Sequence, residues 1–163
     1  MATGRNHRVM PGNLGTVDSM AQLSFVVHGL LERRAAQQDL SIVQMRLLGV
    51  LRDRTPTMNE LTRLLELDKS SITGLVDRAE RRGLVTRVPS KTDGRSVQVQ
   101  VTREGRSIGN RVAAGFEEDI SRFLGPLSDA ERAQLSGLAT RVLVAHASGR
   151  GLDLFSNHGT EQP

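Results

Sequence analysis

Residues 66–85 read ELDKSSITGLVDRAERRGLV, a helical pattern with an unusual outer face. Four apolar residues are spaced i, i+3, i+4 and i+7, which predicts the buried face of an amphipathic helix: Ile72, Leu75, Val76 and Ala79. At about 100° per residue, the opposite face carries Ser70, Gly74, Asp77 and Arg81, flanked by Thr73 and Arg78. This outer face is therefore small and polar at its N-terminal end and charged at its C-terminal end.

Local signals place both ends of this helix and the starts of its neighbours. Asp68 is a favourable N-cap residue, and Gly83 stands where a left-handed residue would end the helix. Three further Ser/Thr-x-x-Glu/Gln sequences have the form of capping boxes and predict helix starts: Ser41 with Gln44, Thr57 with Glu60, and Ser128 with Glu131. Apolar periodicity extends this prediction to helices over 16–38 and from residue 103 onward.

After the quoted stretch the hydrophobic period changes from helical to alternating. Residues 84–88 read LVTRV and residues 97–101 read VQVQV, both rich in β-branched residues. The segment PSKTDGRS between them carries turn-forming and basic residues. These features predict a β-hairpin with a basic, mobile tip.

Composition excludes several classes of protein. The chain of 163 residues is long enough for one domain with a real core, and its lack of Cys excludes disulfides and thiolate metal sites. The N-terminal residues lack the apolar segment of a signal peptide, and no apolar run is long enough to span a bilayer. We therefore expect a soluble cytoplasmic protein that makes no contact with a membrane.

The positive charge is concentrated in the middle of the chain. Residues 46–106 hold 13 Lys and Arg against 8 Asp and Glu, whereas the remainder holds 9 against 10. A basic middle segment suits nucleic acid, although an ordinary Arg-rich surface would give the same count. With no Trp or Tyr and only four Phe, stacking on single strands is disfavoured and duplex DNA is the better candidate.

The order short helix, turn, second helix, strand, basic loop and strand over 57–101 is that of a winged helix-turn-helix. A helix about 10–12 Å across fits the DNA major groove, and small side chains at its leading turn let the backbone approach closely. Hydroxyl groups and the free N–H groups of the helix N-terminus suit base edges and phosphates. The predicted DNA-contacting residues of the two helices are Thr57, Lys69, Ser70, Ser71, Thr73, Arg78 and Arg81.

The hairpin tip supplies a second predicted contact, through Lys91, Asp93 and Arg95. Arg95 is placed to enter a minor groove, where negative potential is concentrated, and Asp93 to orient its guanidinium group. Asp77 would repel phosphate, so we expect it to pair with Arg81 at i+4, or with another arginine.

Each of these signals also has an ordinary explanation. The hydroxyl residues 70, 71 and 73 fit a simple helix cap, the hairpin fits a surface turn, and the arginines fit a solvated helix end. The same layout also serves architectural DNA binders and winged helices that contact only proteins. The order and spacing of the signals favour a DNA-reading module.

The sequence NELTRLLELDKSSITGLVDRAERRGLVTRVPSKTDGRSVQVQVTREGR, residues 59–106, resembles the DNA-binding lobe of the MarR (multiple antibiotic resistance regulator) family. The likeness rests on LDKSSITGLVDR, RGLV and TDGRSVQVQVTREG in combination. It implies a mainly α protein of about six helices with a β-hairpin wing, in which a winged helix-turn-helix (41–102) is joined to dimerisation helices (16–38 and 103–147). It further implies a homodimer that represses transcription from palindromic operators. Independently of the resemblance, the composition of the two ends predicts a disordered arm at 1–15 and a flexible tail at 148–163.

Carried over by position, the resemblance places the recognition helix at 69–82 and the Asp-x-Arg of the wing at Asp93 and Arg95. The chain departs from the family pattern at four positions. Gly74 replaces a base-reading Arg of some members, Gly94 a second wing Arg, Ala79 a larger Leu, and Glu66 a small turn residue.

The dimer has independent support. Apolar stripes at 20–31 and 135–143 lie outside the helix-turn-helix and would form an exposed patch in a lone subunit. A two-fold interface would bury them and set two recognition helices about one DNA turn apart, ~34–36 Å. The alternative is that both helices pack only within their own chain.

The resemblance also implies a small aromatic or anionic ligand bound between the lobes, for which His28, Thr73 and Arg87 are the candidate contacts. We expect no cofactor and no metal, because the four His residues lack metal-ligand spacing. No phosphate-binding Gly-rich loop and no Ser-His-Asp arrangement at recognisable spacing is found, so we do not expect an enzyme.

Overall fold

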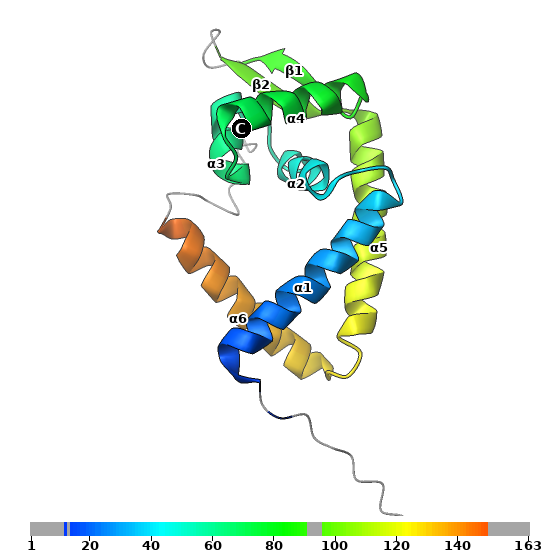
Figure 1. Ribbon diagram of the computed structural model, residues 1–163, viewed down its shortest axis with the longest axis vertical. Helices are drawn as coiled ribbons and strands as arrows, with labels where there is room; N and C mark the ends of the chain where they lie inside the picture. The colour runs from blue at the N-terminus through cyan, green and yellow to red at the C-terminus, as the bar shows by residue number, and fades with distance from the viewer. Residues whose placement is uncertain (1–11, 13, 91–95, 150–163) are drawn as a thin grey trace, which may run out of the picture.

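The computed structural model describes residues 12, 14–90 and 96–149 as a mainly α-helical chain with one hairpin (Figure 1). In chain order the elements are α1 (Gly15–Ala36), α2 (Ile42–Leu51), α3 (Met58–Leu65), α4 (Lys69–Arg81), β1 (Val85–Pro89), β2 (Val97–Val101), α5 (Arg103–Phe123) and α6 (Asp129–Ser148). This architecture confirms the predicted fold class.

The helix starts follow the predicted caps. Complete capping boxes join Ser41 to Gln44, Thr57 to Glu60, and Ser128 to Glu131. Asp68 caps α4, and Gly83 has φ +69° directly after that helix, as the sequence predicted. These agreements are local, because each cap is set by residues within one turn of the helix it begins or ends.

The hydrophobic core includes Ala35 at the end of α1 and otherwise lies within one lobe, formed by α2, α3, α4, the hairpin and the first half of α5. Its fully buried residues come from all of these elements: Leu47, Leu51, Leu61, Leu65, Ile72, Leu75, Val76, Leu84, Val85, Val99 and Val112. The predicted inner face of α4 is buried along its whole length. This packing holds α4 by one side and leaves the other side exposed.

The hairpin pairs its strands antiparallel, with Val85 opposite Val101 and Pro89 opposite Val97. The chain before α3 adds to its edge, because the Val99 N–H donates to the Pro56 carbonyl (2.9 Å) and Thr57 bridges to Gln98. The start of α3 and the wing are therefore fixed to each other through backbone hydrogen bonds.

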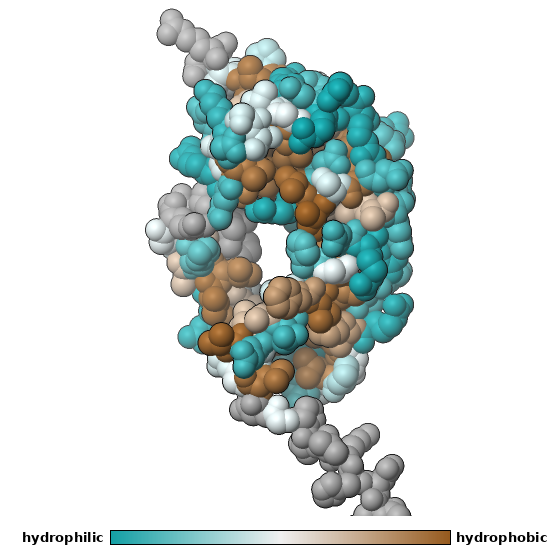
Figure 2. Space-filling model, in the orientation of Figure 1, coloured by the Kyte–Doolittle hydropathy of each residue, from teal (hydrophilic) through white to brown (hydrophobic). Residues whose placement is uncertain are grey.

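The other helices lie below this lobe and together form an open frame (Figure 1). In this frame α5 runs down one side, α1 runs obliquely, and α6 leads back toward the lobe. Arg34 of α1 makes a two-point ion pair with Asp119 of α5, at 2.7 and 2.8 Å, which holds the two helices together. Large apolar residues stay exposed along this frame: Leu14, Val17, Met20, Phe25, Val26, Phe123, Leu135, Leu138, Val142, Leu143 and Val144. Figure 2 shows hydrophobic side chains gathered over this part of the molecule.

Within the described ranges, none of the helices is both long enough and apolar enough to cross a lipid bilayer.

Candidate nucleic-acid interface

The N-terminus of α4 is organised around the carboxylate of Asp68. One of its oxygens accepts hydrogen bonds from the Ser71 N–H (2.9 Å) and the Ser70 hydroxyl (2.5 Å), and the other accepts from the Ser71 hydroxyl (2.5 Å). These hydrogen bonds, led by those from the two hydroxyl groups, hold the pKa of the Asp68 carboxyl well below its usual range. Both serines are exposed, and because their protons point to Asp68, their oxygens face outward as acceptors.

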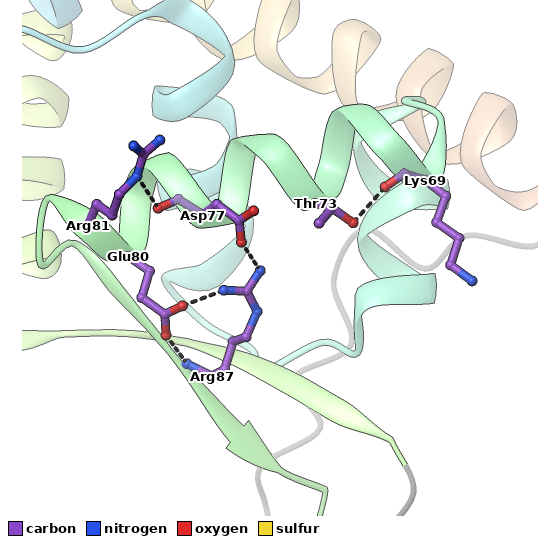
Figure 3. Close-up of polar contacts among 6 residues, drawn as sticks. All are labelled: Lys69, Thr73, Asp77, Glu80, Arg81 and Arg87. Atoms are coloured by element: carbon purple, nitrogen blue, oxygen red, sulfur yellow. Dashed lines mark hydrogen bonds and ion pairs between the residues drawn. The ribbon is translucent and has the colours of Figure 1, made fainter.

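The rest of the leading turn is slim and open. Thr73 is exposed and donates its hydroxyl proton to the Lys69 carbonyl (2.9 Å), four residues earlier. The Lys69 side chain extends away from the helix in Figure 3. The first two turns of α4 thus combine one free cation with three short hydroxyl side chains.

The second half of the outer face is arginine-rich. Arg78 is exposed and lies back over Gly74, since a Cβ built on Gly74 would come within 3.2 Å of an Arg78 Nη atom. Gly74 therefore leaves room for the Arg78 guanidinium group to lie flat along the helix. Arg81 is also exposed, and its Nε donates to the Asp77 backbone carbonyl (3.4 Å).

Arg87 of β1 connects the wing to α4, and this corrects the first pairing expected for Asp77. The Asp77 carboxylate pairs with Nη2 of Arg87 (2.5 Å) and not with the Arg81 side chain at i+4 (Figure 3). Glu80 accepts from the Arg87 backbone N–H (3.0 Å) and from its Nη1. The second expectation, a pair with another arginine, is confirmed.

This network binds the Arg87 guanidinium group tightly. Burial alone would lower the pKa of Arg87, but the hydrogen bonds that its guanidinium group donates to Asp77 and Glu80 outweigh this effect and raise the pKa above its usual value. The single cation also neutralises part of the acidic charge on α4. Sequence spacing did not predict that Glu80 binds Arg87, because Arg87 lies beyond the turn that follows α4, in β1.

The remaining predicted residues are distributed over the molecule. Thr57 is half-buried, and its hydroxyl group is used in the capping box with Glu60. His28 is exposed on α1, away from the α4 face that carries Thr73. Lys91, Asp93 and Arg95 lie outside the described residues.

A small pocket of about 50 Å³ opens between α2 and α5. Met45, Leu48 and Val101 give it a mainly apolar lining, while Arg52 and Arg106 stand at it as cations. Arg106 also donates to the Arg52 backbone carbonyl (3.0 Å), which joins the two helices. Across the part of the chain that the structure describes, no group of three or more His, Asp or Glu side chains is placed to hold a metal ion.

Residues 38–96 match a family model described as MarR family. Over 130 residues the chain is 28% identical to the HTH-type transcriptional regulator PecS of Dickeya dadantii. The match covers 77% of this chain and 78% of PecS. Other relatives of similar identity are named HTH-type transcriptional repressors.

Solved structures show the same fold. Wild-type MarR from E. coli in its apo form superposes with a TM-score of 0.68 at 25% identity, covering 80% of this chain and 98% of that one. NadR in complex with 4-hydroxyphenylacetate superposes with a TM-score of 0.66 at 20% identity, covering 87% of this chain and 97% of that one. The helices and the hairpin described above are therefore those of the winged helix-turn-helix structures to which the chain is similar.

Proposed function

We propose that this chain, whose residues 38–96 match the MarR family model, binds a palindromic operator in double-stranded DNA as a homodimer and represses transcription there. Its site of action would be the cytoplasm, and its role that of a regulator rather than an enzyme. The observation that carries this proposal is the two-sided character of α4: one face is sealed in the core, and the other is exposed, slim and polar.

The leading turn of α4 enters the major groove in this proposal. Ser70 and Ser71 would accept hydrogen bonds from base amino groups, because both hydroxyl groups already donate to Asp68. Lys69, Arg78 and Arg81 would meet phosphates or guanine edges, which are the usual partners of these side chains. Thr73 would line the groove, and Thr57 would hold the start of α3 against the wing.

The wing would supply the second contact through Lys91, Asp93 and Arg95. Support comes from the way the described hairpin is fixed, by Arg87 to α4 and by Val99 to the start of α3. A wing held at both places would approach the duplex together with α4.

Dimerisation would use α1, α5 and α6, and the lobe at 41–102 would be the DNA-binding part. The exposed apolar residues support this, because Val17 is 82% exposed, Phe25 70% and Val142 65% in the single chain. Large apolar patches of this kind are typical of interfaces. Among the described residues of α6 only Ala147 is buried, so this helix has almost no core of its own.

A small aromatic or anionic ligand would modulate DNA binding. The pocket between α2 and α5 supports this, with an apolar lining for a ring and with Arg106 and Arg52 for an anionic group, although Arg52 also pairs with Asp53. Its volume of about 50 Å³ is too small for a ring, so binding would separate α2 from α5. Because α2 also packs against α4, such a movement would reach the DNA-binding face.

His28, Thr73 and Arg87 remain alternative ligand contacts. An anion at Arg87 would have to displace Asp77 or Glu80, which occupy its two Nη groups. That displacement would release the wing from α4, so a ligand at this place would also weaken DNA binding.

Competition gel shifts test the proposal. The purified protein should prefer one palindrome over random DNA by at least ~10³-fold, as specific regulators do. An architectural DNA-binding protein would show little preference, and a winged helix that contacts only proteins would show little binding at all.

A further inference from the structure

Arg82 lies at the C-terminal end of α4 and binds a different part of the molecule from its neighbour Arg81. Its Nη1 donates to the Asp39 backbone carbonyl (2.5 Å), and its Nη2 donates to the Gln38 carbonyl (3.3 Å). Arg81 instead bonds to the carbonyl of Asp77, within α4. Two consecutive arginines therefore have separate partners, one within α4 and one beyond it.

The two carbonyls belong to the turn that directly follows α1. The N–H groups of Gln38 and Asp39 still bond back to Ala35 and Ala36 of that helix (2.9 and 3.0 Å). Asp39 has φ +54°, a left-handed conformation that is uncommon outside glycine, so the turn there is sharply defined. A guanidinium group at this place also meets the negative end of the α1 dipole.

The same turn is held from a third side. Arg111 of α5 donates its Nε proton to the Gln38 side-chain oxygen (3.0 Å). Thus the ends of α1 and α4 and the side of α5 meet at Gln38 and Asp39. Because α1 carries exposed apolar residues such as Val17 and Phe25 nearer its start, this junction links the proposed dimerisation surface to the DNA-reading helix.

We propose that Arg82 is a positioning residue that fixes the direction of α4 relative to α1, and thereby the separation of the two α4 helices in the dimer. This inference rests on the proposed homodimer. The core holds α4 along its inner face and Arg87 holds it to the wing, but neither contact joins it to α1. The two hydrogen bonds of Arg82 fix the end of α4 to the turn after α1 and oppose a pivot relative to that helix. A helix of 13 residues is ~20 Å long, and a pivot of ~15° at Arg82 would move its other end by about 5 Å, more than one base-pair step.

Electron–electron double resonance in the free dimer measures this separation directly. The chain has no Cys, so Lys69→Cys gives a single nitroxide site per subunit, at the end of α4 distant from Arg82. We expect one narrow distance distribution for the labelled protein and a roughly twofold wider one when Arg82→Ala is added, because a helix no longer fixed to that turn samples more orientations. Arg82→Lys, which can still donate to one carbonyl, should fall between them.

Arg81→Ala is the matched control, since it removes the same charge from the neighbouring position and should leave the distribution unchanged. Thermal unfolding by circular dichroism verifies that each variant is folded, as is expected for an exposed side chain. A distribution that stays equally narrow in Arg82→Ala overturns the role of Arg82 and leaves the dimer intact. The absence of any dipolar signal in the labelled protein overturns the dimer, and the inference with it.

Discussion

At the scale of single residues, the carboxylate of Asp68 sets the chemistry of the leading turn of α4. It accepts hydrogen bonds from the hydroxyl groups of both Ser70 and Ser71, so the lone pairs of these hydroxyl oxygens remain available as acceptors. The same hydrogen bonds keep the carboxylate ionised below the range in which aspartate usually takes up a proton. The state of this cap therefore decides what the first turn can offer to a base edge.

The pH dependence of this cap follows from the direction of its pKa shift. The folded-state pKa lies below the unfolded value of 3.8, so the stabilisation is complete above 3.8 and is lost as pH falls through the folded pKa. Carbon-13 NMR titration of the Asp68 carboxyl should give a midpoint clearly below 3.8. In a Ser70→Ala, Ser71→Ala double variant the midpoint should rise toward 3.8. Equal midpoints in the two proteins would show that the hydroxyl groups do not hold the charge.

Arg95 is the residue through which the wing can be tested. Replacing it with alanine should weaken operator binding and reduce the slope of log K against log salt by about one, because one phosphate contact releases about one counterion. Binding titrations at several salt concentrations measure this slope. An unchanged slope would remove Arg95 from the set of phosphate contacts.

At the scale of elements, α4, the hairpin and α5 are held by contacts that the sequence pattern predicts only in part. The capping pairs Thr57–Glu60 and Ser128–Glu131 could be predicted because each lies within one helical turn. The partners of Arg87 and Arg82 could not be predicted in this way. Those of Arg87 lie 7 and 10 residues away in the sequence, and those of Arg82 lie 43 and 44 residues away, so they meet only after folding. Local rules thus predict where the elements begin, whereas ion pairs between elements depend on tertiary packing.

The close approach of α5 to the start of the hairpin gives a prediction for Gly105. A Cβ at this position would lie 2.0 Å from the Leu84 carbonyl oxygen, which is backbone and cannot move aside like a flexible side chain. Gly105→Ala should therefore destabilise the protein by about 1–3 kcal/mol or more, through overpacking.

Gly109, one turn later in the same helix, is the matched control. A Cβ there would lie 3.9 Å from Leu48, an ordinary contact, so Gly109→Ala should be neutral or stabilising by up to ~1 kcal/mol, since alanine favours helix. Urea unfolding of both variants measures the difference. Equal stabilities would contradict the close packing of α5 on Leu84.

At the scale of the whole molecule, the division between a packed lobe and an exposed apolar frame favours a dimer. The sequence predicted this from the stripes at 20–31 and 135–143, and Met20, Leu135, Leu138, Val142 and Leu143 are indeed exposed. Leu30 differs, because it is buried in α1, which packs against both α5 and α2. The pattern of apolar residues predicted the stripe, but only the fold shows which of its residues stay exposed to solvent.

Val142→Asp tests this surface. A carboxylate at a buried interface position carries a large desolvation cost, so the variant should be monomeric at micromolar concentration. Its DNA affinity should fall by about 10²–10⁴-fold, because two linked half-site contacts become one. Sedimentation velocity measures the first effect and gel shifts the second. Val97→Asp, which alters an exposed apolar residue on the hairpin, should stay dimeric, and a dimeric Val142→Asp would place the interface elsewhere.

In the proposed complex, two copies of α4 lie in successive major grooves of one palindrome. Footprinting of the purified protein on the DNA that flanks its own gene tests it most directly. We predict two protected half-sites centred about 10–10.5 base pairs apart, related by two-fold symmetry. Uniform protection without regard to sequence, or a single protected half-site, would contradict it.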